Sequence, residues 1–118
     1  MNLAEFKENM KTADNKLDIT RMDDIIRKSF SDETPDKFRG FTNLIIVMEE
    51  FNEAAQAVSK YLRGKPNAID NLTEELADSL LSVRYVQLIC GISDKELFKA
   101  MNVKLDRQHK RNGTNDKN

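Results

Sequence analysis

The sequence predicts an all-α protein whose helical hairpins pack as a four-helix-bundle-like domain. Apolar residues recur at steps of three and four through two long segments of the chain. Proline and glycine are scarce, at two and four residues, and most of them fall between helical segments. The alternation of apolar and polar residues that is typical of strands is weak throughout.

The longest predicted helix covers residues 38–63, and a second one covers residues 71–90. Gly64 ends the first helix, with Pro66 just beyond it, and Gly91 ends the second. Each helix carries an apolar stripe that we expect to face the core. The first stripe comprises Phe41, Leu44, Met48, Phe51, Ala55, Val58 and Leu62, and the second comprises Leu72, Leu76, Leu80, Val83 and Cys90.

A third long helix is predicted to follow, with Ser93 as its N-cap and Glu96 as the capping-box partner. The first third of the chain is less regular. Residues 3–12 and 20–30 both have short helical patterns, and residues 32–36 have the composition of a loop.

We expect one domain over residues 1–111, with the motif-bearing part in residues 38–111. Residues 112–118 form a polar tail that we expect to be disordered. A chain of 118 residues buries only a modest core by itself. Helices that are apolar on several sides would therefore favour a homo-oligomer.

The charge balance excludes several classes of partner. Charged residues make up 33% of the chain, yet the net charge is only −1. This leaves no basic surface of the kind that nucleic-acid binding or attachment to a membrane surface needs. No apolar run approaches the length of a membrane span, and the first residues lack the apolar core of a signal peptide. A single cysteine allows no intrachain disulfide, so we expect a cytoplasmic protein.

The two long helices carry the same acidic arrangement. Glu50 and Glu53 are three residues apart on the first helix, and Glu75 and Asp78 are three apart on the second. In each segment a residue of the apolar stripe directly follows the first acid of the pair. At about 100° per residue, each pair then lies on the same flank of its stripe. Two antiparallel helices would bring the pairs together.

Small and apolar residues such as Ala54 and Ser79 share this flank with the acids. Like charges in such surroundings repel each other and are poorly solvated, and a divalent cation relieves both effects. Carboxylate oxygens suit Mg²⁺, for which Mn²⁺ can substitute. The residues alone leave a second interpretation open, in which both pairs simply face water. Glu49 and Glu74 lie on the far side of their helices and are weaker candidates.

The acidic pattern resembles the MazG-like, all-α nucleoside triphosphate pyrophosphatase superfamily. The hallmark of that superfamily is EExxE, a spacer of variable length, and ExxD. The corresponding residues are Glu49-Glu50-Phe51-Asn52-Glu53 and Glu75-Leu76-Ala77-Asp78. The residues Asn43-Leu44 and the segment 102–107 also resemble family members. The resemblance covers residues 38–111 and leaves the first third of the chain unmatched.

The resemblance implies Mg²⁺-dependent hydrolysis of a nucleoside or deoxynucleoside triphosphate to the monophosphate and pyrophosphate. It implies a homodimer or homotetramer with active sites at or near a subunit interface. Lys104, and with less support Arg107, would be the substrate-binding residues that contact the phosphates. The metal ligands that it implies are Glu50, Glu53, Glu75 and Asp78.

The hypothesis for the reaction is attack of water on the α-phosphorus, with pyrophosphate as the leaving group. Glu50 or Glu53 would be the catalytic carboxylate that orients or deprotonates this water, and the sequence does not choose between them. The base pocket is not readable from the sequence. Aromatic side chains that could stack on a base, although their helical spacing is more typical of a core, are Phe38, Phe41, Tyr61 and Tyr85.

A non-enzymatic helical interaction module is the alternative function. Such a module would account for the composition and for the expected oligomer. It would not account for two acid pairs on matching flanks beside small and apolar side chains.

Overall fold

The computed structural model describes the backbone of residues 1–31 and 37–116 and the side chains of residues 1–29 and 44–113. Within these residues every regular element is helical and no strand occurs, so the all-α prediction is confirmed for them. The predicted loop at residues 32–36 lies outside the described part. The helices are α1 (Leu3–Met10), α2 (Ile19–Ser31), α3 (Lys37–Leu62), α4 (Ala68–Ile89) and α5 (Asp94–Asp116).

The chain divides into two compact units, residues 1–86 and residues 87–118, and the single domain over residues 1–111 stays a prediction. The first unit holds α1, α2, α3 and most of α4, and the second holds the last turn of α4 and the whole of α5. α5 runs to Asp116 and so includes residues 112–116 of the predicted tail. Over the described residues, no helix combines the length and apolarity of a membrane span.

Glycine ends α3 and α4 at the predicted positions. Gly64 and Gly91 have φ angles of 66° and 69°, a left-handed conformation that glycine adopts without steric cost. After α3, the Lys65 N–H donates to the Lys60 carbonyl oxygen at 3.1 Å. This bond and its equivalent after α4 close Schellman motifs, which satisfy carbonyl groups that have no partner inside the helix.

Side-chain caps begin α2 and α5. The Asp18 Oδ1 accepts from the Arg21 N–H at 3.0 Å, which fixes the start of α2. The Ser93 Oγ accepts from the Glu96 N–H at 3.1 Å, as the sequence predicts for the start of the last helix.

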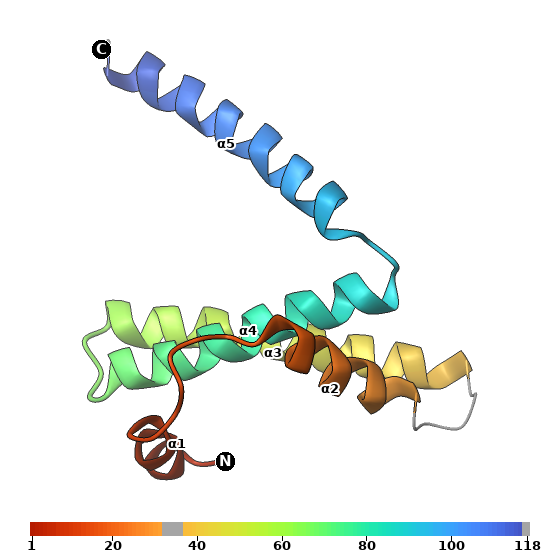
Figure 1. Cartoon of the computed structure of the whole chain (residues 1–118). Helices are drawn as coiled ribbons and strands as arrows, with labels where there is room; N and C mark the ends of the chain where they lie inside the picture. The colour runs from red at the N-terminus through yellow and green to blue at the C-terminus, as the bar shows by residue number, and fades with distance from the viewer. Residues whose placement is uncertain (32–36, 117–118) are drawn as a thin grey trace. The chain divides into compact units, whose positions relative to one another are not determined.

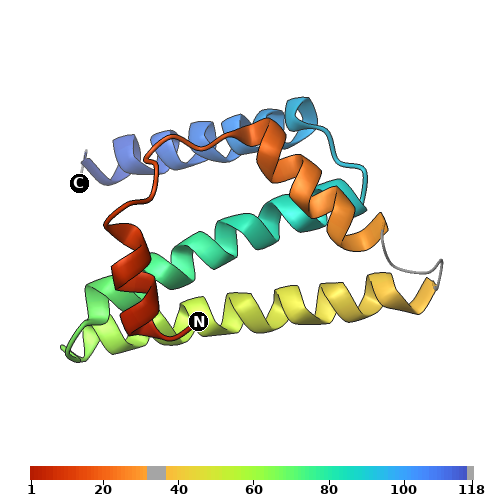
Figure 2. The same ribbon diagram turned by 60° about the horizontal axis from the view of Figure 1, so that its bottom comes forward.

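In the first unit, α3 and α4 run antiparallel and side by side, and α2 lies across them (Figures 1 and 2). The face of α3 that is least exposed follows Val47, Glu50, Ala54 and Ala57, at helical steps of three and four. Val47 is 6% exposed and Ala57 only 1%. Small side chains allow two helix backbones to approach closely, so this face packs within the unit.

The predicted core stripes are wrong for the single chain. Phe51 and Leu76, which the sequence places at the centre of the core-facing side, are 42% and 48% exposed. Leu80, in the same stripe of α4, is 71% exposed. Both long helices are apolar on more than one side, and periodicity does not tell which apolar side meets a neighbour in the same chain. The side of α3 that faces the rest of the unit is offset by one residue from the predicted stripe, so that Val47 is buried where the prediction has Met48.

A buried ion pair fastens α2 to α4. The Arg84 Nε and Nη2 donate to the two carboxylate oxygens of Asp23 at 2.7 Å and 2.6 Å. Both side chains are largely withdrawn from water, at 15% and 13% exposed. The hydrogen bond from Arg84 holds the pKa of Asp23 below its usual value, although burial acts in the opposite direction. This bidentate pair fixes α2 against the α3–α4 hairpin.

We predict that Asp23→Asn lowers the melting temperature at pH 7, because it removes the charge that Arg84 binds. The Asp23 pKa is lowered on folding, so its stabilising contribution is complete above the unfolded value near 3.8. It is lost as the pH falls through the lower folded value. The two proteins should therefore differ less in melting temperature at pH 3 than at pH 7. Thermal melts at both pH values measure this, and the exposed Asp24→Asn is the matched control.

Candidate metal centre

Three carboxylates meet where α3 packs on α4. Glu50, Glu75 and Asp78 each offer an oxygen atom, and these atoms all lie within 4.8 Å of one another. Glu50 comes from the inward face of α3, whereas Glu75 and Asp78 lie one turn apart on α4. We call these residues the acidic cluster. The structure thus brings together three of the four acids that the sequence singles out.

The helix register explains why these acids share one place. Glu50 belongs to the same row of α3 as Val47, Ala54 and Ala57, so it faces α4 instead of solvent. Small residues of this interface, such as Ala54 and Ser79, leave room for the carboxylates. All three acids are half-buried as a result.

The cluster lacks hydrogen bonds that its burial would require. The Glu50 Oε2, the Glu75 Oε2 and the Ser79 Oγ are shielded from water and have no hydrogen-bond partner. A buried polar atom without a partner costs about 1–3 kcal/mol, and native structures contain few of them. A bound cation would supply a partner for the two glutamate oxygens.

Burial and mutual repulsion raise the pKa values of two of these groups. Desolvation is the largest cause for Glu50 and for Glu75, followed by the charges of Glu53 and Asp78. Both carboxylates are therefore harder to ionise than an ordinary glutamate. A bound cation would reverse this effect, since it favours the charged form.

The donor set fits a hard divalent cation. It consists of carboxylate oxygens, with no nitrogen or sulfur ligand among the three residues. Mg²⁺ prefers oxygen ligands and needs only one or two carboxylates from the protein when phosphates and water complete its coordination. The shielded, unpartnered oxygens of Glu50 and Glu75 supply ligands of this type.

Glu53 stands apart from the cluster. It is exposed and is not one of the three residues whose oxygens lie within 4.8 Å. Its charge is nevertheless the strongest of the neighbouring charges that raise the pKa of Glu50 and of Glu75. Glu53 therefore lies at the edge of the cluster, open to water. Glu49 and Glu74 make the smallest contributions to these pKa values.

The predicted phosphate-binding residues belong to the other unit. Lys104 and Arg107 lie three residues apart on α5, and both side chains are exposed. The acidic cluster belongs to the first unit. Contact between these cations and a phosphate bound at the cluster stays a prediction.

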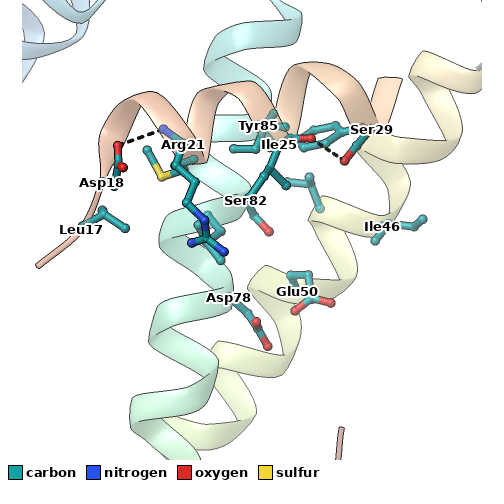
Figure 3. Close-up of a pocket in the computed structure, with 14 residues that line it drawn as sticks. Leu17, Asp18, Arg21, Ile25, Ser29, Ile46, Glu50, Asp78, Ser82 and Tyr85 are labelled. Atoms are coloured by element: carbon teal, nitrogen blue, oxygen red, sulfur yellow. Dashed lines mark hydrogen bonds between the residues drawn. The ribbon is translucent and has the colours of Figure 1, made fainter. Parts of the chain in front are cut away.

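A pocket of about 660 Å³ borders the cluster, and the sequence gives no direct sign of it. α2 forms one wall, and residues of α3 and α4, including Glu50 and Asp78, form the rest (Figure 3). The signal that points to α2 is its apolar row Met22, Ile25 and Ile26, which marks a helix with a covered face.

Among the aromatic residues considered from the sequence, Tyr85 lines this pocket. Tyr61 is 49% exposed and does not line it. The side chains of Phe38 and Phe41 lie outside the described residues.

We predict that Glu50→Gln raises the melting temperature of the protein without metal, because it removes a charge that folding desolvates. The Glu50 pKa is raised on folding, so the ionised group opposes folding at pH 7. Lowering the pH through the raised value, towards the unfolded value near 4.5, relieves this penalty. The gain from Glu50→Gln should therefore be largest near pH 7 and shrink at lower pH.

Thermal melts in a chelating buffer at several pH values measure this effect. Glu49→Gln is the matched control, because Glu49 is exposed and adjacent in sequence. A destabilised Glu50→Gln protein would contradict the repulsion that we assign to the cluster.

A family model described as the MazG nucleotide pyrophosphohydrolase domain matches residues 39–112, which is more than half of the chain. Comparison with the curated proteins and with the solved structures gives no match. The matched segment contains nearly all of α3, the whole of α4 and most of α5, and so includes the acidic cluster. It confirms the family resemblance of the EExxE and ExxD motifs. The chain belongs to the MazG nucleotide pyrophosphohydrolase family.

Proposed function

We propose that this protein is a Mg²⁺-dependent enzyme that hydrolyses a nucleoside or deoxynucleoside triphosphate to the monophosphate and pyrophosphate. Family membership supports nucleotide pyrophosphohydrolase chemistry. The observation that carries the proposal is the acidic cluster, in which buried carboxylate oxygens lack partners beside a pocket. A helical interaction module has no need for such a costly arrangement.

The acids divide into two roles in this proposal. Glu50, Glu75 and Asp78 would hold the metal, with Glu53 completing the ligand set or acting beside it. A bound Mg²⁺ supplies positive charge against the phosphate oxygens and lowers the pKa of a water molecule.

Glu53 is the better candidate for the catalytic carboxylate. A general base needs access to the attacking water and a lone pair that is not engaged elsewhere. Glu53 is open to solvent at the edge of the cluster, whereas Glu50 is half-buried within it. Glu53 would orient the water and accept its proton as the water attacks the α-phosphorus. Pyrophosphate would then leave, and we propose that Lys104 and Arg107 offset its charge.

We also propose that the protein works as a homodimer or homotetramer. The buried hydrophobic residues among those described are Ile26, Val47 and Ala57, which is a small core for helices of this length. Phe51 in the stripe of α3 and Leu76 and Leu80 in the stripe of α4 are exposed instead. Large apolar side chains left exposed on both long helices favour an interaction site, and a second copy would cover them with the same residues.

We predict that the wild-type protein with Mg²⁺ releases pyrophosphate from at least one member of a panel of nucleoside and deoxynucleoside triphosphates. Glu53→Gln should lower kcat about a hundredfold or more, because it removes the general base. Asp78→Asn should lower activity as well, with a higher Mg²⁺ requirement. Chelation of the metal should abolish turnover.

Asp24→Asn, an exposed acid on α2, is the control that should retain wild-type activity. A wild-type protein without activity on every nucleotide would reject the enzyme and leave the interaction module in its place. Full activity in Glu53→Gln would reject only the role of Glu53.

We predict that the wild-type protein sediments as a dimer or a larger species in analytical ultracentrifugation. Leu80→Glu should shift it towards the monomer and lower its melting temperature, because a charge then enters the apolar contact. Gln56→Glu, an exposed polar position on α3, should change neither property. A wild-type monomer at micromolar concentration would refute the assembly.

A further inference from the structure

The pocket beside the acidic cluster has one wall that the family match does not cover. Leu17, Asp18, Arg21 and Met22 are among the lining residues that come from α2 or from the residues just before it. All of them precede residue 39, where the match to the family begins. The pocket also includes Glu50 and Asp78, so it is continuous with the place proposed to hold the metal.

Arg21 is the cation among the described residues that line this pocket. Its side chain extends from the first turn of α2 towards the side of the pocket where Ser82 and Asp78 of α4 lie (Figure 3). The backbone N–H of Arg21 is used in the cap with Asp18. Its guanidinium group forms no hydrogen bond or ion pair with any described residue, and the side chain is exposed.

Arg84 shows what a structural arginine looks like in the same unit. Its guanidinium group makes a bidentate contact with Asp23, and the pair is largely withdrawn from water. Arg21 lies two residues from Asp23 on the helix that this pair fixes. The backbone of Arg21 is therefore held in place, and the donors of its guanidinium group stay available to a ligand.

We propose that Arg21 is a substrate-binding residue that contacts the phosphate chain of the nucleotide, a role that rests on the proposed function. The planar fork of a guanidinium group matches two phosphate oxygens, and the resulting charge-assisted bonds are strong. A nucleoside triphosphate keeps net negative charge after one divalent cation binds, so a further cation beside the cluster is useful. The apolar part of the pocket, including Ile25, Ile46 and Tyr85, then receives the nucleoside.

The test measures KM and kcat for two triphosphates that differ only in the base, in wild type, Arg21→Ala and Arg21→Lys. Arg21→Ala should raise KM about ten- to a hundredfold, and by the same factor for both bases, because the phosphates are common to them. Arg21→Lys should recover part of this loss, since it keeps the charge without the fork. Arg27→Ala, an exposed arginine of α2 that does not line the pocket, should behave as wild type.

Binding gives a readout that does not depend on turnover. Arg21→Ala should weaken binding of an α,β-imido triphosphate analogue, measured by calorimetry with Mg²⁺, by a similar factor. It should leave binding of inorganic Mg²⁺ unchanged, followed as the metal-dependent rise in melting temperature.

The outcomes separate the two proposals. Wild-type activity with an unchanged KM and analogue affinity in Arg21→Ala overturns the role of Arg21 and leaves the proposed function intact. A loss that differs strongly between the two bases overturns the phosphate contact in favour of contact with the base. If Arg21→Ala changes only the Mg²⁺-dependent rise in melting temperature, the phosphate contact is overturned, and Arg21 acts instead as a partner of Asp78. Inactivity of the wild type on every triphosphate rejects both proposals.

Discussion

The packing of three carboxylates into the contact between α3 and α4 is the constraint on which the rest of the structure depends. Like charges in a half-buried place destabilise the folded chain unless a cation or protons neutralise them. Two of the carboxylate oxygens also lack hydrogen-bond partners. If the proposed metal binds at this interface, it would stabilise the folded chain and so couple the folding of the hairpin to metal binding.

The same constraint limits the hydrophobic core. In the part of α3 whose side chains are described, the inward row consists of a valine, the acid and two alanines, so it buries little apolar area there. The larger apolar side chains, such as Phe51 and Leu80, point elsewhere and remain exposed in the single chain. Other interactions must compensate. One is the buried pair of Arg84 and Asp23, which holds α2 on the hairpin, and the other is the assembly that we propose for the exposed stripe.

Local features of this fold were predictable because their causes are local. Gly64 and Ser93 mark helix ends through bonds that reach only a few residues along the chain. The repeated spacing of acids, together with the motif order of a known family, singles out Glu50, Glu53, Glu75 and Asp78, and all of these except Glu53 belong to the acidic cluster. The inward face of α3 differs from the predicted one because periodicity shows which sides of a helix are apolar, but not which of these sides packs against another helix. No spacing in the sequence points to the role that we propose for Arg21, because its place beside the pocket depends on contacts between α2 and α4.

The turn after α3 has a consequence for how the hairpin tolerates changes in length. Gly64 stops α3 at a fixed point, so the acids of the two helices meet only if they stand at matching distances from the turn. One residue inserted between Glu50 and Gly64 would rotate the Glu50 side chain by about 100° and shift it by about 1.5 Å along the axis. The carboxylate would then leave the interface. An insertion preserves the meeting of the acids only when it adds a whole turn to each helix, about seven residues in all. The two helices of this hairpin can therefore lengthen or shorten only by whole turns if the acids are to stay together.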